Sequence, residues 1–136
     1  MFSVQVVREE RGVVLVLRGE LDFESMVQLD EAGQEALALG RGAGPVVADC
    51  AAMAFCDSSG IGALLRLMQP LAEQGRVLRL AGVPAAVARL FAITGLDRIF
   101  EVHPDREQAF AAGRDRRDMV AVGSEESAQL RERQNS

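Results

Sequence analysis

The chain has 136 residues, of which 49% are hydrophobic and 26% are charged, and its net charge is −5 at pH 7. This length suits one domain with a single core that needs no metal or disulfide. The excess of acidic residues argues against binding to nucleic acids or anionic membranes, because both require clustered cations.

Neither export nor membrane insertion is expected from the sequence. The N-terminus lacks a basic region followed by an apolar run, and no stretch approaches the ~18 uncharged apolar residues of a membrane span. Cys50, Cys56 and the single histidine, His103, are too few for a disulfide scaffold or a metal site. We therefore expect a cytoplasmic protein without cofactors, in which both cysteines are small buried side chains and Cys56 follows a loop.

Strand-like and helix-like hydrophobic periods alternate along residues 2–113. The expected strands are 2–7, 13–17, 46–50, 77–81 and 99–102, and the expected helices begin near Glu24, Asp57, Pro84 and Asp105. This β-β-α-β-α-β-α-β-α order predicts an α/β fold with a mixed, mostly parallel sheet of about five strands and four helices, in which the opening strand is antiparallel. Residues 1–113 would form this domain.

The composition changes after Gly113. Residues 114–136 contain five arginines, five acids, few apolar residues and no strong period. Such a segment buries too little apolar area to offset its ordering entropy, so we predict a charged, disordered tail with at most a marginal helix over 125–133.

The segment Phe55-Cys56-Asp57-Ser58-Ser59-Gly60-Ile61-Gly62 precedes a helical period and carries the clearest functional signal. An acid and two hydroxyls at a helix N-terminus lie where the unpaired N–H groups and the helix dipole favour negative charge. Such a segment is most often a cap that contributes about 1 kcal/mol. It can also receive a phosphate.

A second acid is expected beside this segment. Gly19-Glu20-Leu21-Asp22 ends the neighbouring strand, which runs in the same direction, so Asp22 and Asp57 would both approach Ser58. Two carboxylates beside a hydroxyl can assist its deprotonation or hold a cation. The alternative is that Asp22 only caps the helix that begins near Glu24 or Ser25.

Three blocks together resemble the bacterial anti-sigma-factor antagonists, which are stand-alone STAS (sulfate transporter and anti-sigma antagonist) domains. The blocks are Gly19–Asp22, Phe55–Gly62 and Arg89-Leu90-Phe91-Ala92-Ile93-Thr94-Gly95-Leu96, and the resemblance covers roughly residues 2–113. Two departures are Cys56, where the family has a larger apolar residue, and Pro70, which we expect to kink the second helix.

The resemblance implies that the protein is a binding switch rather than an enzyme. Ser58 would be the phosphoacceptor, and the unphosphorylated form would bind an anti-sigma factor that is also a serine kinase, thereby releasing a sigma factor. Phosphorylation would dissociate the complex, and a serine phosphatase would reset it. The implied partner-binding residues are Asp22, Ser25, Asp57, Ser58, Ser59, Gly60, Ile61 and Gly62.

Two other functions were weighed against this one. The chain could be a STAS scaffold subunit of a larger assembly, such as a stress-sensing complex or a lipid-transport ATPase, without a phosphorylation cycle. A hydrolase using Ser58 with His103 lacks the Gly-x-Ser-x-Gly elbow. The absence of lysine excludes a phosphate-binding Gly-x-x-x-x-Gly-Lys loop, so the chain is expected to be a kinase substrate rather than a nucleotide enzyme. Arg89 and Arg98 are expected to be solvated charges.

Overall fold

The computed structural model describes residues 1–112 and contains one five-stranded sheet of order β1-β2-β3-β4-β5. β1 pairs with β2 in the antiparallel direction, and the other neighbours are parallel. The elements are β1 (Phe2–Arg8), β2 (Val13–Leu21), α1 (Met26–Ala38), β3 (Val46–Cys56), α2 (Ser58–Glu73), β4 (Leu78–Ala81), α3 (Ala85–Thr94), β5 (Glu101–His103) and a last helix over 106–112. The predicted fold class is confirmed, whereas the predicted tail at 114–136 lies outside the described residues.

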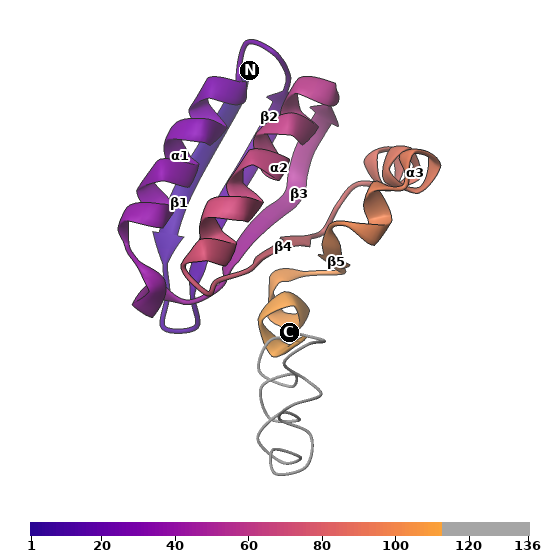
Figure 1. Cartoon of the computed structure of the whole chain (residues 1–136). Helices are drawn as coiled ribbons and strands as arrows, with labels where there is room; N and C mark the ends of the chain where they lie inside the picture. Colours follow the sequence, from indigo (N-terminus) through magenta and orange to yellow (C-terminus); the bar gives the residue numbers. More distant parts are fainter. Residues whose placement is uncertain (113–136) are drawn as a thin grey trace.

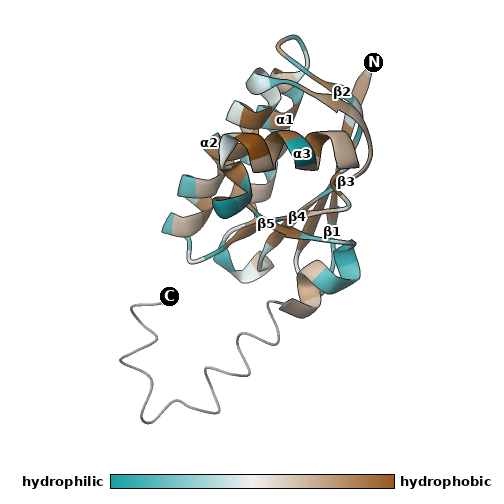
Figure 2. Ribbon diagram, turned by 90° about the vertical axis from the view of Figure 1, so that its right-hand side faces the viewer, coloured by the Kyte–Doolittle hydropathy of each residue, from teal (hydrophilic) through white to brown (hydrophobic). Residues whose placement is uncertain are grey.

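The helices divide between the two faces of the sheet. Helices α1, α2 and α3 lie together on one side of the strands (Figure 2) and enclose the larger core, to which Leu15, Leu64 and Phe91 contribute. The last helix covers part of the opposite face with Ala109 and Phe110. β2 is therefore buried on both faces, which explains its nearly continuous apolar sequence.

The third strand is longer than its sequence predicts. The expected strand 46–50 continues to Cys56, because β3 stays paired with β2 as far as the Leu21–Cys56 pair. Alanine has low β-propensity, and the run at 51–54 contains three alanines, so pairing rather than propensity extends this strand. Cys56 thus ends a strand and does not follow a loop, which corrects the prediction.

The helix ends follow the predicted signals with small shifts. Pro84 is the N-cap of α3 rather than its first residue, and Gly95 ends that helix in the left-handed conformation at φ 81°. The Asp105 carboxylate accepts a hydrogen bond from the Gln108 N–H at 2.9 Å, as an N-cap does. α2 contains Pro70 and continues through it to Glu73.

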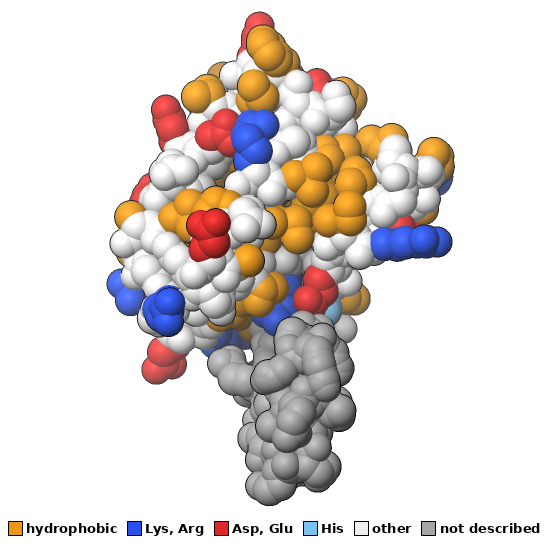
Figure 3. All heavy atoms as spheres, viewed as in Figure 1, with side chains coloured by type: hydrophobic (Ala, Val, Ile, Leu, Met, Phe, Trp, Pro, Cys, Tyr) orange, Lys and Arg blue, Asp and Glu red, His pale blue; other side chains and the backbone are white. Residues whose placement is uncertain are grey.

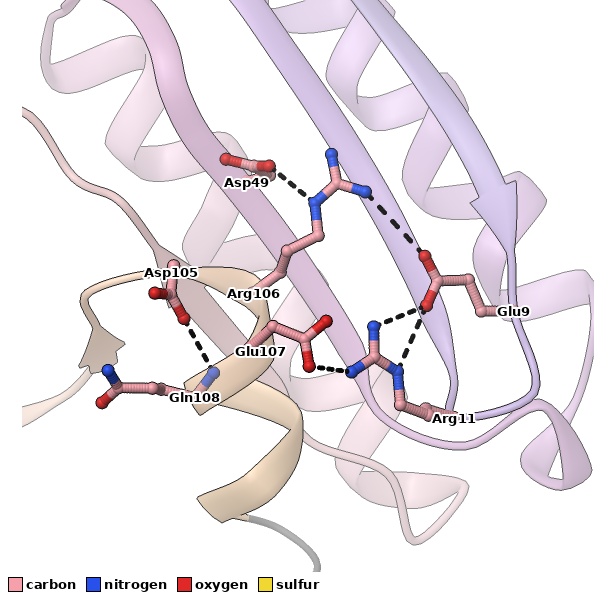
Figure 4. Close-up of polar contacts among 7 residues, drawn as sticks. All are labelled: Glu9, Arg11, Asp49, Asp105, Arg106, Glu107 and Gln108. Carbon is pink, nitrogen blue, oxygen red and sulfur yellow. Dashed lines mark hydrogen bonds and ion pairs between the residues drawn. The ribbon is translucent and has the colours of Figure 1, made fainter.

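Ion pairs attach the last helix to the hairpin and to the sheet (Figure 4). Arg11 lies between Glu107 (2.8 Å) and Glu9 (3.0 Å), and Arg106 donates to Asp49 at 2.9 Å. The Arg106 guanidinium also lies 3.8 Å from the Glu9 carboxylate. The two arginines therefore connect residues that are far apart in the sequence, and they fix the helix over the second face.

Both cysteines are expected to resist alkylation in the folded protein. Burial raises the pKa of Cys50 and of Cys56 to about 12 in each case, and the reactive thiolate is correspondingly scarce. Iodoacetamide at mildly alkaline pH should add no mass to the native protein and two adducts to the urea-unfolded protein, as measured by intact mass. Rapid labelling of Cys56 in the native protein would contradict this packing.

Candidate functional site

The candidate site is formed where β2 and β3 end side by side. Both strands point to the same end of the sheet (Figure 1), and Leu21 is paired with Cys56. The Asp57 N–H donates to the Leu21 carbonyl at 3.2 Å, so the two chains remain together one residue beyond that pair. The residues that follow, Asp22 and Asp57, consequently lie at the same end of the sheet, just beyond the carboxyl ends of two neighbouring strands.

Asp57 is the N-cap of α2. Its Oδ1 accepts hydrogen bonds from the N–H groups of Ser59 at 2.9 Å and Gly60 at 3.1 Å. These are donors that an uncapped helix leaves without partners. Because the acid caps the helix, the hydroxyl of Ser58 is not needed for capping.

Ser58 is the first residue of α2, and it is exposed. Its hydroxyl makes no hydrogen bond with any of the residues 1–112. The position next to the helix N-terminus favours added negative charge, by about 0.3–1 kcal/mol at an exposed site. An exposed hydroxyl in this place can accept a phosphate without any change in the helix.

Asp22 holds the turn between β2 and α1. Its Oδ1 accepts from the N–H groups of Glu24 and Ser25, both at 3.1 Å. The hydrogen bond from the Ser25 N–H, above all, lowers the pKa of the Asp22 carboxyl below its usual value. Asp22 therefore holds the turn that precedes α1, whose N-cap is Ser25, and its half-buried carboxylate follows the end of β2.

Ser25 is a structural residue of this turn. Its side chain is buried, its Oγ donates to the Glu20 carbonyl at 2.8 Å, and the Asp22 N–H donates to it at 2.9 Å. Gly60 and Ile61 are buried as well. Of the partner-binding residues implied by the resemblance, these three lie beneath the surface, where they support the exposed ones.

Gly60 allows the start of α2 to touch the strands. A Cβ at this position would lie 2.7 Å from the Leu21 Cγ, 2.8 Å from the Leu21 carbonyl oxygen and 2.9 Å from the Cys56 Sγ. All three separations are shorter than normal van der Waals contacts. The absence of a side chain at Gly60 therefore lets α2 begin in close contact with the carboxyl ends of β2 and β3, and this contact positions Ser58.

Two exposed aromatic side chains flank the acids, and the sequence reasoning did not include them in the site. Phe23, which follows Asp22, is 69% exposed, and Phe55, two residues before Asp57, is 50% exposed. Large exposed apolar side chains beside a polar centre are typical of protein interfaces. Their places next to the two acids were visible in the sequence, but their exposure was not.

A further apolar surface lies beside α2. Figure 3 shows apolar side chains gathered between α2 and α3, and the partly buried apolar residues on these two helices are Leu65, Met68 and Leu90. Among residues 1–112 no group of three or more His, Cys, Asp or Glu side chains is arranged to hold a metal ion. The exposed chemistry at the start of α2 is thus the hydroxyl of Ser58 next to the capping carboxylate of Asp57, with apolar side chains on the surface nearby.

The sequence profile described as "Mlab, STAS domain" matches residues 4–102, which is most of the chain. The chain belongs to the STAS domain family. Within residues 1–112, none of the helices of this STAS domain is both long and apolar enough to cross a membrane.

Solved structures of STAS proteins share its fold. An anti-sigma factor antagonist from Mycobacterium paratuberculosis is 23% identical, with a TM-score of 0.74, 84% of this chain covered and 95% of the other. A putative anti-sigma factor antagonist from Thermotoga maritima is 19% identical, with a TM-score of 0.70 and coverages of 83% and 94%. The Bacillus cell fate determinant SpoIIAA in its phosphorylated form is 25% identical, with a TM-score of 0.61 and coverages of 81% and 98%.

Proposed function

We propose that this STAS protein is an anti-sigma-factor antagonist whose binding is switched off by phosphorylation of Ser58. In the unphosphorylated form it would bind an anti-sigma factor with serine kinase activity and so release a sigma factor. The observation that carries the proposal is the exposed, unbonded hydroxyl of Ser58 at the start of α2, where Asp57 has already taken over the capping. The likeness to a phosphorylated STAS structure supports it.

The mechanism of the switch is local electrostatics and bulk. A phosphoserine adds about −1.5 to −2 charge at pH 7. The phosphate would lie at the end of the sheet where β2 leads into Asp22 and β3 leads into Asp57, so an approaching partner would meet concentrated negative charge. Burying charged oxygens without a partner costs several kcal/mol, and each 1.4 kcal/mol corresponds to tenfold in affinity. Phosphorylation should therefore weaken binding a hundredfold or more without unfolding the domain.

The partner would dock over Phe23 and Phe55, with Ser58 inside the contact. In this arrangement the aromatic side chains would contribute to the binding energy, and phosphorylation of the Ser58 hydroxyl would prevent binding. A serine phosphatase would restore the binding form. The protein itself would catalyse no reaction.

The test begins with affinity isolation of the protein from the bacterium that encodes it, followed by mass spectrometry of the partner and of Ser58. The isolated partner is then titrated with wild type, Ser58→Asp, Ser58→Ala and the control Ser3→Asp, which places an acid at an exposed serine outside the site. We expect Ser58→Asp to lose much of the affinity, Ser58→Ala to bind but resist release by ATP, and the control to match wild type.

Equal affinities of all four proteins, or phosphate on Ser59 alone, would contradict the proposal. Isolation of a large assembly in which Ser58 never carries phosphate would instead support the scaffold function weighed above.

A further inference from the structure

Strand β1 forms one edge of the sheet, and no strand among residues 1–112 pairs with its outer side. Edge strands in natural proteins are usually protected by lysine, proline, inward charges or bulges. Residues 2–7 contain no charged residue and no proline, and the register with β2 runs without a shift. With seven residues, β1 is also much longer than the three-residue strand β5 at the opposite edge.

The hairpin geometry identifies which backbone groups of β1 point outward. Glu9 and Gly12 exchange two hydrogen bonds, of 2.7 and 3.2 Å. Because hydrogen-bonded and non-hydrogen-bonded pairs alternate along an antiparallel ladder, Val7, Gln5 and Ser3 also direct their N–H and C=O groups toward β2. The intervening residues, Phe2, Val4, Val6 and Arg8, direct theirs away from the sheet.

These outward groups are self-complementary. When β1 is placed antiparallel to a second β1 with Gln5 opposite Gln5, Val4 lies opposite Val6 of the second copy, and both belong to the outward-facing set. The same register places Phe2 opposite Arg8. Every outward N–H and C=O then finds a partner, and the apolar stripe formed by Val4 and Val6, which packs against the core, continues across the contact.

Charges of both signs lie near the two ends of β1. The acids Glu20 and Glu24 are exposed near the start of the strand, where the Met1 amino group contacts Glu20 at 2.8 Å. The exposed Arg8 lies at the end of the strand, and Arg41 follows α1, which runs alongside β1 (Figure 1). The exposed Arg18 beside the start of β1 and the exposed Glu10 after its end carry the opposite signs, so the backbone register and the apolar stripe, and not charge, favour this contact.

We propose that the outer edge of β1 binds a second copy of this chain, joining the two five-stranded sheets antiparallel about Gln5. The contact is symmetric and closed, as in most homodimers. It includes no residue of the candidate site, so the proposal is independent of the proposed function.

Cysteine cross-linking tests the register directly. A non-hydrogen-bonded antiparallel pair has Cα atoms about 4.5 Å apart, within the ~4.4–6.8 Å range of disulfides. Gln5→Cys should therefore give a covalent dimer of twice 14.6 kDa under mild oxidation. Ser3→Cys is the matched control, because its two copies would be four register positions, or about 13 Å, apart. The native Cys50 and Cys56 are buried and should not interfere.

Sedimentation provides a second, non-covalent measurement. Wild type should shift from monomer to dimer over a thousandfold range of concentration. Gln5→Lys should move this transition to at least tenfold higher concentration, because like charges would face each other on the two-fold axis, whereas Ser3→Lys should shift it much less. Gln5 and Ser3 are both exposed, so neither variant should disturb the monomer. A wild type that stays monomeric, or equal cross-linking at positions 3 and 5, would overturn the proposal.

Discussion

Replacing Phe110 with alanine is expected to lower the free energy of unfolding by about 3–5 kcal/mol. The side chain is only 4% exposed and packs with Val14, Val16 and Val47 on the second face of the sheet. The Arg11 guanidinium lies 4.4 Å from its ring centroid, which adds a cation–π contact. Truncation therefore removes apolar contacts, leaves a cavity over β2 and loosens the ion pairs beside it.

Urea denaturation followed by circular dichroism measures this loss. Phe23→Ala is the matched control, because it removes the same side chain from an exposed position and should change stability by less than about 0.5 kcal/mol. If the two variants were equally stable, the last helix would not cover the sheet as described.

Gly60→Ala should destabilise the protein by about 1–3 kcal/mol, although alanine is normally the better helix former. Its Cβ would lie 2.8 Å from the Leu21 carbonyl oxygen, a backbone atom that cannot swing away. The start of α2 would have to move away from the ends of β2 and β3, and Ser58 would move with it. We expect reduced thermal stability and faster alkylation of Cys56, which lies beneath this turn.

Gly62 provides the control from the same helix. A Cβ there would meet only the end of the flexible Arg66 side chain, at 3.4 Å. Gly62→Ala should consequently stabilise the protein by about 0.5–1 kcal/mol, the usual gain for this exchange in a helix. Opposite signs for the two variants, measured by thermal unfolding, would distinguish close packing from helix propensity. Two stabilised variants would contradict the packing described for Gly60.

The order of the elements was predictable from the sequence because each signal is local. The hydrophobic period identifies strands and helices. Gly95 marks the end of α3 through its left-handed backbone conformation, and Asp105 marks the start of the last helix through a side-chain hydrogen bond. The short predicted strand 46–50 is an error that a distant partner explains, because pairing with β2 extends β3 to Cys56. The predicted strand 99–102 is displaced to Glu101–His103, because the N–H groups of Ile99 and Phe100 donate to the Leu96 carbonyl of the preceding 3₁₀ turn, Leu96–Arg98, and not to β4.

The buried arginines were not predictable. Arg76 is 5% exposed and donates to the carbonyls of Gly44 at 2.7 Å and Ala36 at 3.0 Å, although burial lowers its pKa. Arg79, which is 3% exposed, pairs with Glu101 at 2.8 Å. The sequence does not distinguish a buried arginine from a solvated one, and only the three-dimensional structure brings acceptors to these two.

For the candidate site, the sequence indicated where each residue lies along the elements, but it did not indicate which of these residues are exposed. Asp57 and Ser58 could be assigned to a helix start from their neighbours alone. The burial of Ser25 and Ile61 depends on how α1 and α2 pack on the sheet, and that information is not contained in a local motif.

The placement of the last helix has a consequence for synthesis on the ribosome. Arg11 in the first hairpin and Glu107 in the last helix are separated by 96 positions, and within residues 1–112 it is this late helix that packs on the second face of β2. At about 5–20 residues per second, translation needs roughly 5–20 s to cross this interval. During that time the nascent chain can assemble one layer of helices, while Val14, Val16 and Val47 remain open to chaperones or to neighbouring nascent chains.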